Sequence, residues 1–452
     1  MLGRTTAVAL TGLDGEVVEV EADAASGLPA FTITGLPDAA LGEARDRVRA
    51  AIGNSGLPFT LRRLTVNLSP ASLPKAGSSF DLAIAVAVLS ASELVPAGRV
   101  QRVVHLAELG LDGRLRPVPG VLPAVLAAVR RGRHRVVVAK ANESEARLVQ
   151  GAEVLAVGSL AELVGLYRGE PVPEELLVDL RDLDEDGATG QDDAPAASAG
   201  TVDLADVAGQ EEARRAVEVA AAGGHHLLLV GPPGAGKTML AARLPGLLPD
   251  LDSEVALEVT AVHSLARRLP RGGLITRPPF VDPHHTASVA AIVGGGSGTP
   301  RPGAISLAHG GVLFLDEAPE WNRATLDALR QPLESGTLTI SRSRATATYP
   351  ARFQLVLAAN PCPCGRASGP GRDCTCTPTA QRRYLRRLSG PLLDRVDLQL
   401  TVRAVTRAAI RRAATAEPTA VVAARFAVAR AAQRERLSHT PGGTTRRCPG
   451  RS

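Results

Sequence analysis

The sequence predicts an α/β protein built from two units. Strand-like runs alternate with helical runs along residues 1–172 and again along residues 201–403, and an acidic stretch lies between the two regions. A glycine-rich phosphate-loop motif occupies residues 231–238, between an apolar run and a helical segment. At 452 residues the chain exceeds the size at which one hydrophobic core usually stops growing, so more than one folding unit is expected.

The first unit, residues 1–172, is predicted from the order of its strand-like and helical runs. The expected strands are residues 7–13, 16–24, 63–70, 134–141 and 152–159, and the expected helices are residues 40–56, 80–92 and 121–132. This alternation indicates an α/β domain.

Residues 173–200 are predicted to be an acidic, flexible linker, because they combine many carboxylates with the closing segment DDAPAASAG. The second unit then runs over residues 201–403. Its expected strands include residues 225–231, 310–317 and 353–360, and its expected helices include residues 211–223, 238–248 and 323–334.

Charge and composition limit the class of protein. The formal net charge is +5, and from Gln381 onward arginines heavily outnumber carboxylates, which fits either a nucleic-acid surface or a GC-rich genome. Aromatic residues make up 2% of the chain, so any nucleic acid is expected to bind through its phosphates. No apolar run reaches the roughly 18 residues of a membrane span, and the N-terminus lacks a signal-peptide pattern. We therefore expect a cytoplasmic protein without a membrane partner.

The motif GPPGAGKT predicts a nucleotide-phosphate site. Its glycines let backbone N–H groups curl around phosphate oxygens, and the following helix N-terminus adds positive potential. Lys237 is expected to reach the outer phosphates and Thr238 to hold magnesium. The predicted binding residues are Gly231, Pro232, Pro233, Gly234, Ala235, Gly236, Lys237, Thr238 and, further along the chain, Asp316.

Two later strands are expected to complete this site. The apolar run GGVLFLDE ends in Asp316 and Glu317, where Asp316 can hold the metal and Glu317 can orient or deprotonate the attacking water. The run FQLVLAAN ends at Asn360, whose amide can position that water. A solvated acidic turn is the alternative for the two carboxylates, and the upstream phosphate loop disfavours it.

These motifs, together with PFVDPHHTAS, LRQPLESGTLTISR and LSGPLLDRVDL, resemble the ComM/YifB branch of the magnesium-chelatase-like AAA+ ATPases over nearly the whole chain. The resemblance implies a ring-forming homo-hexamer that uses ATP and Mg²⁺, with ComM acting as a DNA branch-migration helicase in natural transformation. It also implies that Asn360 is the sensor residue and that Arg395 is an arginine finger for the neighbouring subunit. On the bare sequence, Arg395 would more simply form a surface ion pair.

Residues 334–353 contain the alternating run TLTISRSRATAT, which suits a β-hairpin. In related ring ATPases such a hairpin points to the central pore, which would bring Arg342 or Arg344 to a phosphate backbone. A solvated hairpin face is the alternative.

Four of the five cysteines lie in one loop, residues 362–376. The pattern Cys-x-Cys, nine residues, Cys-x-Cys can present four sulfurs to zinc, and such a clasp would order a loop with few apolar residues. Reduced thiols without metal, and redox chemistry, remain alternatives. The expected ligands are Cys362, Cys364, Cys374 and Cys376.

The segment LSPASLPKAGSSFDLAIAVAV resembles the part of Lon-type proteases that carries their serine nucleophile, which places Ser79 at the position of that serine. The position of the family's lysine base is occupied by Leu122, so no base remains. The resemblance implies an S5/Lon-protease-like α/β domain used for assembly or DNA contact, without proteolysis.

The end of the chain departs from the family pattern. Residues 404–437 are expected to begin a helical lid whose apolar faces lack partners, because the rest of the lid, with a second sensor arginine, is missing. Residues 438–452 match what a one-base frameshift of the family sequence would encode, which would make Cys448 accidental.

The sequence thus favours an AAA+ P-loop NTPase domain, preceded by the S5/Lon-like domain, that couples ATP hydrolysis to DNA remodelling. One alternative is a metal-insertion motor like the ATPase subunit of magnesium chelatase. Another is a nucleotide-binding scaffold that does not cycle, which the truncated lid favours. The cysteine loop and the first unit favour the DNA motor, since the resemblance places both in the ComM/YifB branch.

Overall fold

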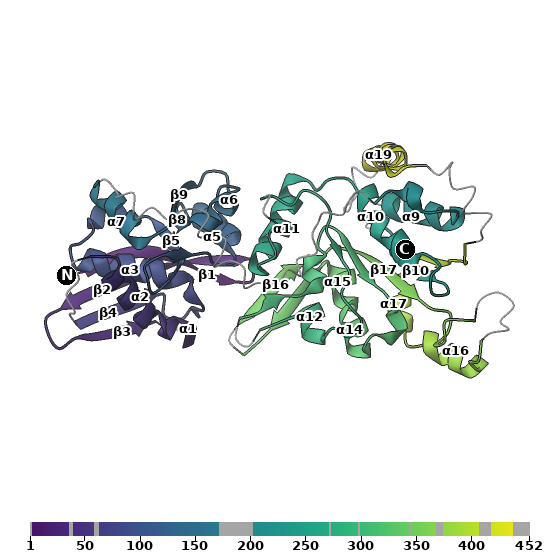
Figure 1. The fold of residues 1–452 in the computed structure, drawn as a ribbon, viewed down its shortest axis with the longest axis horizontal. Coiled ribbons are helices and arrows are strands. Elements are labelled where there is room, and N and C mark those ends of the chain that lie inside the picture. Colours follow the sequence, from purple (N-terminus) through teal and green to yellow (C-terminus); the bar gives the residue numbers. More distant parts are fainter. Residues whose placement is uncertain are drawn as a thin grey trace.

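The computed structural model describes residues 2–35, 39–57, 63–170, 202–270, 273–296, 299–343, 345–367, 374–405 and 417–436. The predicted linker and the predicted frameshifted tail lie outside these residues. The described part forms two α/β units, one on a seven-stranded sheet and one on a five-stranded sheet (Figure 1). None of the helices it contains has both the length and the apolar character to cross a membrane.

The first unit is built on the strand order β3-β4-β2-β1-β5-β8-β9. β1 and β2 form a long antiparallel hairpin, whereas β5, β8 and β9 continue the sheet in parallel. The sheet strands are β1 (Leu2–Thr11), β2 (Asp14–Ala25), β3 (Ala30–Thr34), β4 (Arg63–Ser69), β5 (Val104–Leu106), β8 (Arg135–Ala139) and β9 (Glu153–Val157), and β6 (Glu108–Leu109) pairs with β7 (Leu115–Arg116).

Short helices cover this sheet. They are α1 (Ala39–Gly42), α2 (Ala44–Asn54), α3 (Asp81–Ala91), α4 (Ala97–Val100), α5 (Val121–Arg130), α6 (Glu143–Ala146) and α7 (Leu160–Arg168), with the 3-10 turns η1 (Ser78–Phe80) and η2 (Lys140–Asn142). The single helix predicted over residues 40–56 is therefore interrupted near Glu43. The strands β3 and β5 were not predicted, because such short runs show too little periodicity.

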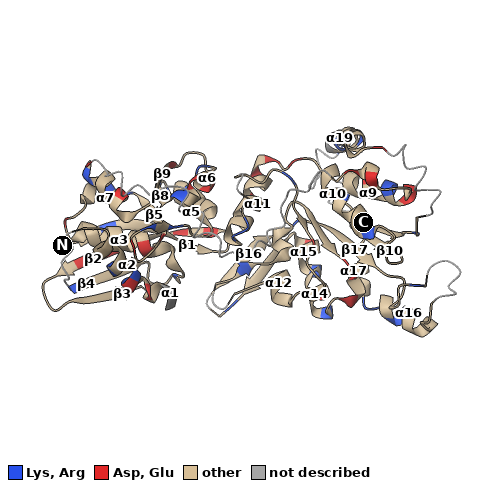
Figure 2. Cartoon of the chain, viewed as in Figure 1, with Lys and Arg blue, Asp and Glu red and all other residues tan. Residues whose placement is uncertain are grey.

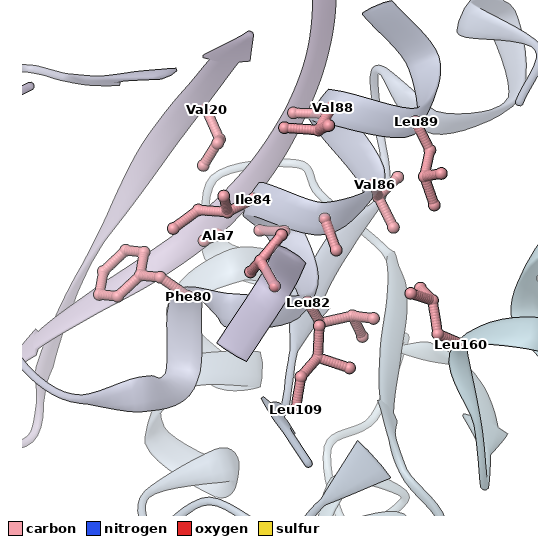
Figure 3. Packing of buried hydrophobic residues seen from close by; sticks show 14 of the residues in the cluster. Ala7, Val20, Phe80, Leu82, Ile84, Val86, Val88, Leu89, Leu109 and Leu160 are labelled. Atoms are coloured by element: carbon pink, nitrogen blue, oxygen red, sulfur yellow. The ribbon is translucent and has the colours of Figure 1, made fainter. Parts of the chain in front are cut away.

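Helix α3 is the centre of the first unit, because every one of its residues is buried. A helix that is apolar all round must be covered on all sides. Figure 3 shows its side chains packed among those of β1, β2 and the segments around Leu109 and Leu160. Its one carboxylate, Asp81, accepts two hydrogen bonds from the Arg47 guanidinium, at 2.7 and 3.0 Å, so the buried charge is paired.

The second unit contains a parallel sheet in the order β11-β14-β17-β10-β18. Its strands are β10 (Leu227–Val230), β11 (Phe280–Val281), β14 (Val312–Leu315), β17 (Gln354–Ala359) and β18 (Leu398–Thr401), with the hairpins β12 (Gly294–Gly295) and β13 (Arg301–Pro302), and β15 (Thr337–Ser341) and β16 (Thr346–Pro350). All six residues of the central strand β17 are buried, as both faces of a parallel sheet are covered.

The helices of the second unit surround this sheet. They are α9 (Glu211–Gly223), α10 (Lys237–Leu247), α11 (Ser253–Leu265), α12 (Val289–Val293), α13 (Ala304–Leu307), α14 (Arg323–Ala328), α15 (Arg330–Ser335), α16 (Pro378–Leu385), α17 (Gly390–Leu393) and α19 (Thr419–Arg436), with the 3-10 turns η4 (Leu204–Asp206) and η5 (Ala318–Glu320). The helix predicted over residues 323–334 is thus two short helices.

Helix α19 corrects one expectation from the sequence in part. Its apolar residues were expected to lack partners, but Val422 and Phe426 are only 2% and 3% exposed and pack in the core cluster formed with α9 and α10. Val421 and Val428 remain 48% and 72% exposed, as expected. Arg425 adds ion pairs to Glu218 of α9 and to Glu417. The start of this C-terminal segment therefore uses the core of the second unit as its partner.

The two units touch where α5 lies near α11 (Figure 1). The Ser264 hydroxyl of α11 donates to the carboxylate of Glu145 and accepts a 2.9 Å hydrogen bond from Gly120 N. Leu122 N also donates to Glu145, at 2.8 Å. Burial raises the pKa of the Glu145 carboxyl. The junction therefore combines apolar packing between α5 and α11 with buried hydrogen bonds.

Candidate nucleotide-binding site

The phosphate-loop motif connects β10 to α10. Its first residue, Gly231, is fixed to the sheet by a 3.0 Å hydrogen bond from its N–H to Ala359 O, and a Cβ on Gly231 would lie 2.3 Å from Val402 O. Gly234 and Gly236 have φ values of +74° and +90°, which favour glycine, and a Cβ on either would meet nothing within 4 Å. The loop is therefore closed toward the sheet and open on its other side, at the N-terminus of α10.

Lys237 is the first residue of α10, and its side chain folds back into the loop. Its Nζ donates to Gly231 O at 2.7 Å, to Pro232 O at 3.1 Å and to Asn360 Oδ1 at 3.1 Å. Burial lowers the pKa of the Lys237 ammonium, while the charges of Asp316 and Glu317 act in the opposite direction. The structure thus places Lys237 beside Asn360, as the strand order brings the ends of β10 and β17 together.

Thr238 and Asp316 meet at the same edge of the sheet. Thr238 Oγ1 donates a 2.8 Å hydrogen bond to Asp316 Oδ2, although 78 residues separate them. The other carboxylate oxygen accepts from Glu317 N at 2.8 Å, and Trp321 Nε1 donates to Asp316 O at 2.9 Å. A hydroxyl and a carboxylate are hard oxygen donors, so this pair fits a Mg²⁺ ion.

Glu317 follows β14 in an unusual conformation. Its φ of 49° lies in the left-handed region, which is strained for a residue other than glycine and is often found at functional positions. Its carboxylate, with 46% of the side chain exposed, lies 3.1 Å from Nδ1 of His285. Glu317 therefore faces the open side of the site.

His285 was not among the residues predicted for the site. It follows the short strand β11, which pairs in parallel with β14, so the segments after the two strands, with His285 and Glu317, leave the sheet at the same edge. The sequence carried a signal, because the segment PFVDPHHTAS belongs to the family pattern. The sequence predicted no role for His285, because the position of a histidine in a loop does not indicate which carboxylate it will contact.

Arg395 lies just after α17. Its guanidinium donates to a carboxylate oxygen of Glu334, and the two side chains are 43% and 56% exposed. Within one chain, Arg395 therefore forms the surface ion pair that the bare sequence suggests.

The four loop cysteines come together as predicted. The Sγ–Sγ distances are 3.3 Å for Cys362–Cys364 and 3.7 Å for Cys374 to each of these two, and the Sγ atoms of all four lie within 4.8 Å of one another. Tetrahedral zinc with bonds of about 2.3 Å would separate its sulfurs by roughly 3.8 Å, so the cluster fits the metal. The thiols form no disulfide. A hydrogen bond from the Arg366 backbone and one from Cys362 lower the pKa of Cys364 to about 6.

This cysteine cluster borders the phosphate loop. Gly365 lies so close that a Cβ on it would be 2.8 Å from the ring of Pro233. The cluster also contacts the following helix, because Gln381 Nε2 donates to Cys374 Sγ and to Cys376 O, both at 3.4 Å. A metal held there would fix the position of two neighbouring elements.

The predicted β-hairpin is β15 and β16. Arg342 at its tip donates to Gly294 O at 3.0 Å, and Tyr349 OH donates to Pro300 O at 2.7 Å, so the hairpin is bound to the segment of β12 and β13. Arg344 lies outside the described residues. The structure gives Arg342 a backbone partner and leaves its side chain exposed.

In the first unit, Leu122 is completely buried in an apolar cluster. An apolar side chain at this position offers no base to Ser79, which lies in η1. The neighbouring Ser78 hydroxyl donates to Glu108.

The chain is similar to known proteins over most of its length. Residues 203–410 match the family described as "Magnesium chelatase, subunit ChlI", and residues 20–142 match "Subunit ChlI of Mg-chelatase". An uncharacterized protein of Mycobacterium tuberculosis strain H37Rv is 55% identical over 440 residues, covering 96% of this chain and 83% of the relative. Part of the chain also matches Lon proteases.

Two further relatives carry names. The uncharacterized protein YifB of Escherichia coli strain K12 is 46% identical over 394 residues, which cover 87% of this chain and 74% of YifB. The competence protein ComM of Haemophilus influenzae strain Rd is 44% identical over 391 residues, which cover 86% of this chain and 74% of ComM.

Proposed function

The chain belongs to the ComM/YifB family of magnesium-chelatase-like AAA+ ATPases, and from this premise we propose that it is an ATP-driven motor that remodels DNA. The family and the fold class expected from the sequence are confirmed, and the family is one of ATPases. DNA as the substrate is our proposal. It is supported by the competence protein among the relatives and by the arginine excess in the second half of the chain.

The observation that carries the ATPase proposal is the convergence of three strand ends on the phosphate loop. The ends of β10, β14 and β17 bring Lys237, Asp316 and Asn360 together. ATP would supply the phosphoryl group, and bound Mg²⁺ would offset the charge of its phosphates. The open glycines would bind the phosphates, with Thr238 and Asp316 holding the metal.

Glu317 and Asn360 would act on the attacking water. Glu317 is the carboxylate on the open side of the site, so it is the group placed to orient the water or accept its proton. Asn360 already holds Lys237 at 3.1 Å and would share its amide between that lysine and the water. Both roles require no large movement of the sheet.

Arg395 would complete the site of a neighbouring subunit in a homo-hexamer. The transferring phosphoryl group needs a positive charge, which an arginine can supply in trans. The pair with Glu334 is half exposed, and such a pair contributes little to stability. Arg395 could therefore release Glu334 and bind the phosphate in the neighbouring subunit at a small cost in free energy.

Zinc in the cysteine cluster would have a structural role. The cluster lies against Pro233 of the phosphate loop and against Gln381 of α16, so the metal would order the segment between the end of β17 and α16.

A metal-insertion motor remains the second candidate, because the matching family descriptions name magnesium chelatase. The two candidates differ in what stimulates ATP hydrolysis. Duplex or branched DNA should stimulate a DNA motor, whereas a metal-insertion motor should be indifferent to DNA. A nucleotide-binding scaffold would bind ATP without steady turnover.

The test is phosphate release by the purified chain with and without branched DNA. The Glu317→Gln variant should bind ATP like the wild type and lose hydrolysis by about two orders of magnitude or more. Glu254→Gln, at an exposed position of α11, is the matched control and should hydrolyse ATP normally. Full hydrolysis by Glu317→Gln would refute the site, and an absence of DNA stimulation would refute the DNA motor.

A further inference from the structure

We propose that the exposed arginines Arg382, Arg383 and Arg386 form a DNA-backbone binding surface on and beside α16, separate from the hairpin at residues 337–350. We call these three residues the α16 surface. The proposal rests on the proposed action on DNA and identifies where the phosphates would bind.

The orientation of α16 exposes these arginines. Tyr384 and Leu388, four residues apart, are 4% and 3% exposed and hold the segment against the second unit. Arg382, Arg383 and Arg386 lie on the remaining faces and are exposed. In Figure 2, α16 carries basic residues and no acidic ones.

Among the residues that the structure describes, other arginines have acidic partners that these three lack. Arg387, the next residue, donates to Glu320 at 3.1 Å, and Arg425 pairs with two glutamates. Across the described ranges, by contrast, no carboxylate pairs with any member of the α16 surface. Like charges three and four residues apart, as in Arg383–Arg386 and Arg382–Arg386, repel one another, so the surface favours a polyanion that can neutralise all three.

The surface is also held in place before any ligand arrives. Thr377 caps α16 by accepting a 3.2 Å hydrogen bond from Ala380 N, and Gln381 donates to Cys374 Sγ of the cysteine cluster. At the other end, Arg387 donates to Pro319 O at 3.2 Å, within η5. Charged groups on an element fixed at both ends lose less conformational entropy when they bind.

The chemistry of the surface selects phosphates over bases. The one aromatic residue of α16, Tyr384, is buried, so no ring is available to stack on a base. Guanidinium groups bind phosphate oxygens with paired N–H donors. The expected ligand is therefore the sugar–phosphate backbone, without preference for sequence.

The α16 surface also lies close to the nucleotide site. Arg387 and Tyr384 contact η5, whose first residue follows Glu317 directly. DNA on the α16 surface would thus bind one helix away from the carboxylate proposed to act on water. A solvated basic face or a contact to an acidic face of a neighbouring subunit are the competing explanations.

The experiment measures binding of a fluorescent duplex and a fluorescent single strand by the full chain, over a series of salt concentrations. The variant changes Arg382, Arg383 and Arg386 to Gln. We expect its affinity for both probes to fall by about tenfold or more near 0.1 M salt. The slope of log K against log salt should flatten by about 0.9 for each lost contact to the duplex.

The matched control changes Arg131, Arg133 and Arg135 to Gln. These arginines of the first unit carry the same total charge; Arg131 and Arg135 are exposed and pair with Glu16 and Glu153, and Arg133 is partly exposed. Both variants should bind ATP like the wild type, which verifies the fold of the nucleotide site. The control should keep its DNA affinity within about twofold.

The outcomes separate the competing explanations. Unchanged DNA binding by the α16 variant, or equal weakening by both variants, overturns the proposal. Sedimentation without DNA tests the subunit contact: if the α16 variant loses assembly, the arginines are contacts between subunits and the proposal is wrong. Wild-type protein that binds neither probe refutes the proposed action on DNA itself, whereas wild-type binding with an unaffected variant refutes only the α16 surface.

Discussion

Two buried lysines, one in each unit, have opposite uses in this protein. The chain has only three lysines, and both Lys75 and Lys237 are nearly inaccessible, with 1% and 7% exposure. Lys75 Nζ donates to the carbonyl oxygens of Gly35, Leu68 and Pro70. Lys237 likewise donates to two carbonyl oxygens, and burial lowers the pKa of both ammonium groups.

The surroundings distinguish the two residues. Around Lys75, burial is the cause that shifts its pKa, and its three acceptors are all backbone carbonyls. Beside Lys237, the charges of Asp316 and Glu317 oppose the effect of burial, and the loop glycines leave open space. A buried lysine therefore serves the fold where backbone carbonyls alone surround it, and it would serve a ligand where carboxylates and open space adjoin it.

The strongest test of this comparison is Lys237→Ala. Loss of the cation should reduce ATP hydrolysis by about 10³-fold or more, because the outer phosphates lose their charged donor. Titration with nucleotide and phosphate release measure the effect. Lys140→Ala, at a partly exposed position, is the control and should behave like the wild type. Normal turnover by Lys237→Ala would contradict the assignment.

The reverse outcome is expected for Lys75→Met. Methionine keeps most of the apolar volume but leaves the carbonyl oxygen of buried Leu68, and those of Gly35 and Pro70, without this donor, which should destabilise the first unit by about 1–3 kcal/mol. Hydrogen exchange of β4 amides measures the loss locally. ATP binding should persist. The comparison fails if Lys75→Met lowers ATP affinity while exchange in the first unit is unchanged.

A smaller effect is expected from the metal cluster. Wild-type protein should carry about one zinc per chain, and changing Cys362 and Cys364 to Ser should remove it, because two thiolates cannot fill a tetrahedral site. Since Gly365 lies against Pro233, ATP affinity should then fall about tenfold. Elemental analysis and nucleotide titration give the two readouts. Reduced, freshly purified wild type without zinc would exclude the clasp.

The smallest expected effect is a pH dependence caused by Lys75. Its pKa is lower in the folded state than the ordinary value of 10.5, so between these two values the unfolded chain binds more protons. The free energy of unfolding should therefore rise with pH in this window relative to that of Lys75→Met. Urea denaturation of both proteins from pH 7 to 10 measures the difference. A difference that stays constant or falls would show that desolvation is not the controlling cause.

The local sequence was sufficient to predict a structural element where one short segment contains all the residues that determine that element. The phosphate loop, the strands ending at Asp316 and Asn360, and the cysteine loop were each predicted at their observed positions, because neighbouring residues alone dictate a tight glycine turn or an apolar strand. Periodicity failed for the short strands β3 and β5 and for the helix that divides into α14 and α15.

The sequence by itself determined the family, the α/β class and the residue types available for phosphate, magnesium and zinc. Tertiary structure alone decided which distant groups meet: His285 with Glu317, Arg395 with Glu334, Ser264 with Glu145, and α19 with α9 and α10. The physical reason is that each of these contacts depends on strand order and helix packing. Those are set by burial over the whole chain, and no local pattern of residues contains them.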